Sequence, residues 1–260
     1  MRRLLLPVPL LFALAACPKP APEGGKNLLS QVKAGLAERD AKVSSYRLVG
    51  ATREQGLEAG FEFSYRAPNK MRGQLTRPQR RTFSFDGAKL FDLQQDEKRF
   101  TAYEMKLPPE KSALFLTQTF SPFASEGYRV PLLLREGVTV TRTAHPKAPE
   151  AVEVKMETKD EAGQTLSVVY HLRWPALDFL GKRSETGGQV VEVRVDEEHC
   201  EEALKMCFPK KLTQWDGKNP IATTVLSKVE INPQIPAGEF TLSAPEGFDA
   251  KDQQLVEQGK

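Results

Sequence analysis

The chain has 260 residues, of which 40% are hydrophobic, including 14 Phe, and 27% are charged. This apolar share is enough to build a core, which excludes a globally disordered protein. The 37 Lys and Arg residues nearly balance the 34 Asp and Glu residues, so the charge gives no argument for a nucleic-acid partner.

The first seventeen residues are typical of an exported lipoprotein. Arg2 and Arg3 form a short basic start, residues 4–13 are an apolar run, and residues 14–17 are Leu-Ala-Ala-Cys. A basic start, about 7–15 apolar residues and small residues at the cut define a secretory signal peptide. The terminal cysteine makes this motif resemble the bacterial lipobox, whose cysteine becomes the lipidated first residue of the mature chain. We therefore expect a signal peptide over 1–16 and lipidation at Cys17.

Two other interpretations of this start have less support. An ordinary secretion signal would leave Cys17 incidental. A transmembrane anchor needs about 20 apolar residues, whereas this run is short and contains Pro7 and Pro9. Residues 17–26 then form the lipid anchor and a Pro-rich linker, which favours an extended chain. Pro18 follows the cysteine where inner-membrane lipoproteins of similar type carry Asp, which favours the periplasmic side of the outer membrane.

An amphipathic helix is predicted directly after the linker. Leu28, Val32, Leu36 and other apolar residues recur at near-helical spacing, which predicts a helix over 27–43. Gly35 lowers the intrinsic stability of this helix but does not exclude it.

From Ser45 the apolar period changes to two, which is the period of a half-buried strand. Breaks at Pro68-Asn69 and Asp86-Gly87 have the composition of turns, and Asp-Gly is a strong hairpin signal. The pattern therefore predicts six short strands in an antiparallel meander. These strands begin at Ser45 and continue at 57–65, 71–76, 82–85, 90–94 and 99–105.

A second helix and a second run of strands follow. Pro109 is well placed to start a helix over 110–120, and 130–134 is a short apolar segment that is helical or a loop. The predicted strands are 151–159, 164–174, 177–185, 189–196, 210–215 and 222–231. We expect one domain over 27–249, with one large antiparallel sheet and few helices, and a frayed tail over 250–260. So long a sheet must curl.

The two remaining cysteines, Cys200 and Cys207, suit a disulfide that closes a short loop in an oxidising compartment. The alternative is a metal site formed by both cysteines and His199, with a carboxylate from the acidic residues around them as fourth ligand. Their spacing matches no zinc pattern, so the disulfide is favoured.

Sequence patterns of catalysis are weak. The histidines are His145, His171 and His199, and they form no recognisable nucleophile or metal motif. The acidic run 196–202 is typical of a solvated loop, with a cation site as the less favoured alternative. We therefore expect a protein that is not an enzyme and that holds no metal and no cofactor.

Several motifs resemble the LolA/LolB-type family of periplasmic lipoprotein carriers and outer-membrane lipoprotein receptors. They are Arg-Ala-Pro-Asn-Lys-Met-Arg at 66–72, Pro78, Phe-Ser-Phe-Asp-Gly-Ala-Lys-Leu-Phe at 83–91, and the C-terminal segments 236–240 and 245–249. The match covers 45–105 and 229–249. In the family, aromatic residues flank the arginine that corresponds to Arg72, where this chain has Met71 and Gly73. Residues 175–220 have no assigned counterpart.

The resemblance implies a mainly β, α+β fold: a strongly curved antiparallel half-barrel with helices covering a concave apolar face that holds acyl chains. The candidate lid consists of residues 110–123 and 130–134, with Leu114 and Phe115. The resemblance also implies that Arg72 faces the concave side and hydrogen-bonds this lid; a solvent-facing position is the alternative. Residues of alternating strand positions are expected to line the cavity or, alternatively, only to pack the core: Phe61, Phe63, Tyr65, Met71, Leu75, Phe83 and Phe85.

Two functions remain open at this level. The first is a lipid-anchored acceptor or receptor in lipoprotein localisation, which binds acyl chains of lipoproteins or lipids and meets a periplasmic carrier protein. The second is an envelope sensor or scaffold that uses the same fold to bind a protein partner. Because a shuttling carrier must be soluble, the anchor at Cys17 favours a stationary role.

Overall fold

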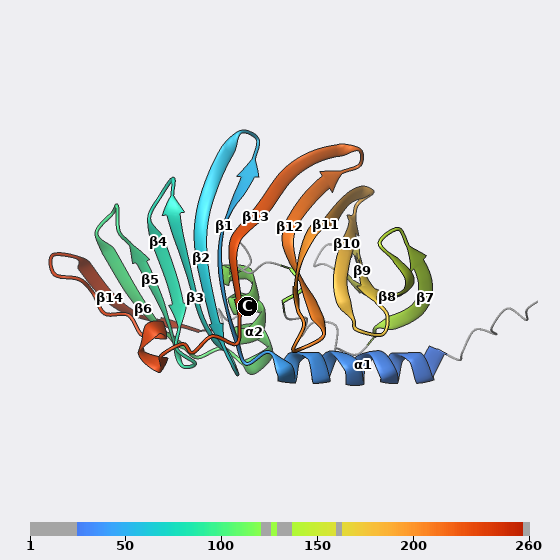
Figure 1. Ribbon diagram of the computed structural model, residues 1–260. Coiled ribbons are helices and arrows are strands. Elements are labelled where there is room, and N and C mark those ends of the chain that lie inside the picture. Colours follow the sequence, from blue (N-terminus) through green and yellow to red (C-terminus); the bar gives the residue numbers. More distant parts are fainter. Residues whose placement is uncertain (1–24, 121–125, 129–136, 160–162, 257–260) are drawn as a thin grey trace, which may run out of the picture.

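A computed structural model of the chain describes residues 25–120, 126–128, 137–159 and 163–256 (Figure 1). The described strands form one 14-stranded sheet in the order β14-β6-β5-β4-β3-β2-β1-β13-β12-β11-β10-β9-β8-β7. The sheet curves strongly without closing, so its two ends lie far apart (Figure 1). This confirms the predicted mainly β, curved antiparallel half-barrel.

The first half of the sheet is the predicted meander. Each strand pairs antiparallel with the next, and the hairpin at Asp86-Gly87 forms as its composition requires. Gly87 has a φ of +106°, and Asp86 Oδ1 accepts hydrogen bonds from the backbone N–H groups of Ala88 and Lys89. The strands are β1 (Ser45–Glu54), β2 (Leu57–Arg66), β3 (Lys70–Arg77), β4 (Arg81–Phe85), β5 (Lys89–Gln94) and β6 (Arg99–Met105).

The second half is another antiparallel meander, which β13 joins to the first by pairing with β1. Its strands are β7 (Thr139–His145), β8 (Ala148–Lys159), β9 (Thr165–Arg173), β10 (Asp178–Thr186), β11 (Gln189–Glu201), β12 (Met206–Asp216) and β13 (Asn219–Ile231). The sequence predicted six of these strands and missed β7.

The acidic run 196–202 was predicted as a loop, and this is wrong for most of its length. β11 continues to Glu201, and Cys200 lies opposite Cys207 of β12. Register shifts near Glu197 accommodate the run. Pairing with β12 and the cross-strand disulfide stabilise a strand that the intrinsic preference of its acidic residues disfavours.

The prediction of a frayed tail over 250–260 is also wrong for its first part. β14 (Asp249–Leu255) pairs in parallel with β6 and forms one edge of the sheet. Its residues are polar and almost all exposed, so no apolar alternation marked it in the sequence. Backbone pairing with β6, together with the packing of the partly buried Phe248 against the cluster of Phe91 and Phe100, explains the strand. The domain therefore extends at least to Leu255.

Two helices supplement the sheet. α1 (Gly25–Lys42) begins two residues before the predicted start and runs along the lower ends of β8–β12 in Figure 1. Its buried residues Leu28, Val32 and Leu36 share one core cluster with apolar residues of β7–β12. Gly35 permits close packing, because a Cβ there would lie 2.7 Å from Leu177 Cδ1. The helix thus packs against the lower part of this half of the sheet.

α2 (Pro109–Phe120) lies on the inner face of the other half, behind the sheet in Figure 1. Leu116 and Phe120 are buried in a second cluster with residues of β1–β5. Among the residues that the structure describes, no helix is long and apolar enough to cross a membrane.

Candidate functional site

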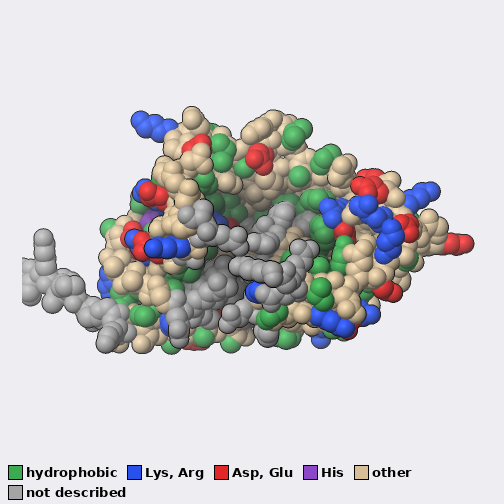
Figure 2. Space-filling view, turned by 180° about the vertical axis from the view of Figure 1, so that it is seen from behind, with side chains coloured by type: hydrophobic (Ala, Val, Ile, Leu, Met, Phe, Trp, Pro, Cys, Tyr) green, Lys and Arg blue, Asp and Glu red, His purple; other side chains and the backbone are tan. Residues whose placement is uncertain are grey.

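The candidate site is the inner face of β2–β6 beneath α2. Strand alternation places the predicted lining residues on this one face, because neighbouring positions point to opposite sides. The pairings Phe63–Gly73, Tyr65–Met71 and Met71–Phe85 align these side chains across three strands. Seen from behind the view of Figure 1, where α2 lies, the molecule is hollowed and hydrophobic side chains lie in the hollow (Figure 2).

The predicted lining residues divide into two groups. Phe61, Phe63, Tyr65 and Phe85 are buried in the core cluster, so core packing accounts for them. Met71, Leu75 and Phe83 are only partly buried against the same cluster. A partly exposed apolar side chain on an inner face is the kind of surface that an apolar ligand can cover. These residues therefore are the better candidates for ligand contact.

Helix α2 adds its own residues to this surface. Phe120 packs its edge against Phe63 with ring centroids 6.1 Å apart, which holds the helix on the sheet. Phe115 is partly buried against the cluster. Leu114 lies in α2, but its side chain is outside the described set, as are the lid residues 121–123 and 130–134.

The sequence did not indicate all of the apolar wall. Tyr103 and Met105 of β6 and Leu255 of β14 are also partly buried against the cluster. The alternation of Tyr103 and Met105 along β6 could have identified them, whereas Leu255 could not be placed without β14.

Tyr128 is a further core residue that the sequence did not indicate. Its ring stacks on Phe208 and contacts Tyr46, and its hydroxyl donates to Pro209 O at 2.7 Å. Burial raises the pKa of Tyr128 far above its usual 10. This aromatic group belongs to the same core cluster as the wall of β2–β6.

Arg72 does not have the role that the resemblance implied. It lies opposite Ser64, on the face away from Phe63, and its Nη1 donates to Glu239 O at 3.1 Å. Glu239 belongs to the short 3-10 helix η2 (Ala237–Phe240). The Glu239 carboxylate also accepts hydrogen bonds from Ser64 and Arg47. Because Met71 faces inward, its neighbour Arg72 must face outward. The arginine therefore fixes the C-terminal segment, not α2.

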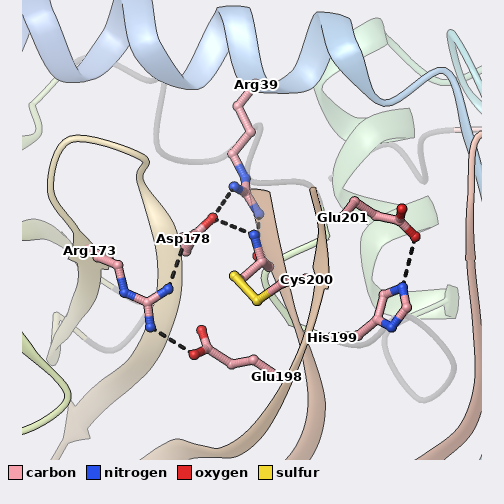
Figure 3. The surroundings of a disulfide bond; sticks show 8 residues. Arg39, Arg173, Asp178, Glu198, His199, Cys200 and Glu201 are labelled. Atoms are coloured by element: carbon pink, nitrogen blue, oxygen red, sulfur yellow. Dashed lines mark hydrogen bonds and ion pairs between the residues drawn. A yellow bond between two sulfur atoms is a disulfide. The ribbon is translucent and has the colours of Figure 1, made fainter. Parts of the chain in front are cut away.

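A buried ion network surrounds the disulfide that joins Cys200 and Cys207 (Figure 3). Arg39 of α1 donates to Asp178 Oδ1 at 2.6 Å and to Cys207 O at 2.8 Å. Asp178 Oδ1 also accepts from the backbone N–H of Cys207 at 2.9 Å, and Arg173 bridges Asp178 to Glu198. Burial lowers the pKa of Arg39, against the opposing effect of Asp178.

The bond between Cys200 and Cys207 confirms the predicted disulfide, and neither sulfur is therefore available as a thiolate ligand for a metal. Within the described ranges, no group of three or more His, Cys, Asp or Glu residues is arranged to hold a metal ion. The network links α1 to the β11–β12 hairpin, a connection that the sequence did not indicate because Arg39 and Asp178 are 139 positions apart.

A second charged group lies at the far end of the apolar wall. Arg81 donates to both carboxylate oxygens of Asp92, at 2.9 and 2.8 Å, and its guanidinium lies 4.4 Å from the ring centroid of Phe83. The hydrogen bonds that Arg81 donates to Asp92 raise the pKa of Arg81. Arg81, Phe83 and Phe85 alternate along β4, so the arginine shares the inner face with the wall.

Comparison with solved structures identifies the fold. A DUF1329 family protein from Desulfovibrio piger aligns with a TM-score of 0.53 at 10% identity, covering 81% of this chain and 97% of that one. A domain from Vibrio parahaemolyticus, described as an outer membrane lipoprotein-sorting protein domain, aligns with a TM-score of 0.55 at 9% identity, covering 82% and 97%. A LolA superfamily protein from Nitrosomonas europaea aligns with a TM-score of 0.45 at 8% identity, covering 84% and 97%.

No protein-family model matches the sequence, and no curated protein is significantly similar to it. At such low identity the first two alignments show the fold alone. The fold shared with these two structures is a strongly curved antiparallel sheet that does not close, which is the architecture that the sequence motifs implied.

Proposed function

We propose that this protein binds acyl chains of lipoproteins or lipids on the inner face of β2–β6, as a membrane-anchored acceptor in the bacterial cell envelope. The observation that carries the proposal is the partly exposed apolar wall beneath α2. Met71, Leu75 and Phe83 are left partly uncovered there.

The physical chemistry of acyl chains suits this surface. Burial of each CH₂ group contributes about 0.8 kcal/mol, so roughly ten buried methylenes contribute about 8 kcal/mol before the costs of association. Such binding needs apolar area and a removable cover, and it needs no catalytic group. The function is therefore proposed to be non-enzymatic.

Anchoring through Cys17 is the second part of the proposal. A lipid at this residue and the Pro-rich linker over 17–26 would hold the domain at a distance from the outer membrane, facing the periplasm. A fixed acceptor of this kind would receive its cargo from a soluble periplasmic carrier protein. If Cys17 is the anchor, Cys17→Ser moves the protein from the membrane fraction to the soluble fraction, and membrane retention of this variant contradicts it.

Two variants of neighbouring residues on β3 test the site. Leu75→Lys places a charge on the apolar wall, whereas Gln74→Lys places the same charge on the opposite face. We expect protein purified without detergent to carry lipid detectable by mass spectrometry. Leu75→Lys should lose most of it, and Gln74→Lys should retain it. Wild-type protein free of lipid that also fails to bind added fatty acid would contradict the proposal.

A groove on the opposite face favours a second candidate function, the binding of a protein partner by an envelope sensor or scaffold. The groove has a volume of about 700 Å³ and lies over β13, β1 and β2, where Val49, Ala51 and Val225 line it. Val225 is 45% exposed. A partner captured by wild type and by Leu75→Lys, but not by Val225→Glu, would support this function over lipid binding.

A further inference from the structure

The apolar wall changes character along the strands. At its lower end, Phe85 of β4 lies opposite Leu90 of β5, and both are buried. Two residues nearer the start of β4, Phe83 lies opposite Asp92. At the upper end, where β4 begins, Arg81 lies opposite Gln94. From Phe85 to Arg81 the strand rises roughly 13 Å. The inner face therefore has an apolar end and a charged end, as an amphiphile has a chain and a head.

The charged end is a connected network. Asp92 is only 4% exposed and accepts hydrogen bonds from Arg81 and from Gln94 Nε2, the latter at 2.9 Å. Gln94 in turn accepts from Arg99 of β6. Arg99 also pairs with Glu97 at 2.9 Å, but the Glu97 side chain is 59% exposed. The network thus holds two guanidinium groups and two carboxylates, of which Asp92 is buried and pairs with Arg81, while Glu97 is exposed and pairs with Arg99.

Arg81 is oriented and still accessible. Asp92 fixes its guanidinium through two hydrogen bonds and the ring of Phe83 supports it from one side, yet 39% of its side chain is exposed. A guanidinium has five N–H donors, of which Asp92 occupies two. Lys and Arg side chains gather beside the hollow, with Asp and Glu side chains among them, on the side of the molecule formed by β3–β6 and β14 (Figure 2).

We propose that the ligand of this site is an acyl amphiphile with a negatively charged head, a carboxylate or a phosphate, which binds at Arg81 while the chain runs past Phe83 toward Met71 and Phe115. This inference rests on the proposed function and adds the chemical class of the ligand to it. Charge-assisted hydrogen bonds from a fixed guanidinium are stronger than neutral ones. They give the site a means to distinguish a charged head from a neutral one.

The experiment compares two fluorescent ligands that differ only in the head, cis-parinaric acid and its methyl ester, titrated at pH 8 into the protein purified without detergent and stripped of bound lipid. We expect wild type to bind the acid about tenfold more tightly than the ester, which corresponds to the strength of a hydrogen bond to a charged group. Arg81→Gln should bind both ligands equally, and Arg81→Lys should restore part of the preference.

Two further variants separate the head site from folding and from general charge. Arg81→Gln leaves Asp92 buried without its main partner, so the double variant Arg81→Gln/Asp92→Asn removes both charges and should also lose the preference while remaining folded by circular dichroism. Arg80→Gln is the control: Arg80 directly precedes β4, is exposed and pairs with Asp96, and its loss should leave the preference intact.

The outcomes distinguish this inference from the function on which it rests. Equal binding of acid and ester by wild type overturns the charged head and leaves acyl binding in place. A preference that persists in the double variant overturns the assignment to Arg81. Failure of wild type to bind either ligand overturns the proposed function and this inference with it.

Discussion

Arg39 and Asp178 form an ion pair that is almost completely buried, with side chains 4% and 3% exposed. Asp178 also accepts hydrogen bonds from Arg173 and from the backbone of Cys207, so its oxygens are well satisfied. Charges removed from water stabilise a fold only when they are paired and hydrogen-bonded in this way. The pair therefore fixes how α1 meets the β11–β12 hairpin more than it adds net stability.

Removal of one partner of the Arg39–Asp178 ion pair should destabilise the fold. Asp178→Ala leaves the Arg39 guanidinium buried without its carboxylate, and we expect the free energy of unfolding to fall by about 3–5 kcal/mol, measured by urea denaturation. Glu38→Ala, which removes an exposed ion pair with Lys42 in the same helix, is the control and should unfold almost as wild type does. A loss as small as that of the control would contradict the structural role of the buried pair.

His145 gives the protein a component of pH-dependent stability. Burial, and then the proximity of His171, Lys147 and Arg173, lower the pKa of His145 below its usual 6.5. The folded state therefore binds a proton less readily than the unfolded state does. The contribution is fully present above about pH 6.5 and is lost as the pH falls through the lowered pKa.

The sign of this effect can be checked with one substitution. His145→Gln should lose less stability than wild type on acidification below pH 6.5. The urea midpoint of unfolding should therefore fall less between pH 7 and pH 5 in the variant than in wild type. The effect should be modest because the side chain is partly exposed to solvent. An NMR titration that places the pKa of His145 at or above 6.5 would contradict the prediction.

At the scale of elements, the β11–β12 hairpin depends on a covalent link. Its end carries the acidic residues that resemble a loop in the sequence, and Cys200 and Cys207 join its strands directly opposite each other. The same segment receives Arg39 of α1 through the carbonyl of Cys207. The disulfide thus supports both the hairpin and the contact that holds the end of the helix.

The double variant Cys200→Ala/Cys207→Ala should therefore be less stable than wild type. A loop of about eight residues corresponds to roughly 2.5 kcal/mol in the chain-entropy account of disulfides. Urea denaturation with and without dithiothreitol measures the effect, since the reductant should destabilise wild type and leave the variant unchanged. Equal stability of the reduced and oxidised wild-type protein would contradict this prediction.

Elements differ in how far the sequence revealed them. β2 and β3 alternate between apolar inward and polar outward residues, so their existence and their faces could be predicted. β7 and β14 could not, because they are polar edge strands held by backbone pairing with β8 and β6. Local composition does not report a hydrogen-bonding partner that is distant in the chain.

At the scale of the whole molecule, the two helices pack on different halves of one inner face. α1 places Leu28, Val32 and Leu36 into the half formed by β7–β12. α2 buries Leu116 and Phe120 over the half formed by β1–β5 and leaves residues such as Leu75 partly uncovered. The ligand site that we propose lies on the half that packs on α2.

Hydrogen exchange should map this asymmetry. With cis-parinaric acid in excess, we expect amide exchange to slow in α2, β3, β4 and β6, because a ligand stabilises the states to which it binds. Exchange in β8–β10 should change little. Mass spectrometry of peptides with and without the fatty acid provides the measurement, and protection centred on β8–β10 would contradict the assignment.

The sequence by itself determined the class of the fold, the meander of β1–β6, both helices and the pairing of Cys200 with Cys207. Each follows from local periodicity, turn chemistry or counting, which depend on neighbouring residues. Only the tertiary structure decided that Arg72 faces outward to η2, that Arg39 meets Asp178, and that Phe61 and Phe63 are core while Leu75 and Phe83 remain partly uncovered. Burial and pairing of this kind depend on which distant strands and helices meet, because the curvature of the sheet and the positions of α1 and α2 set the space available to each side chain.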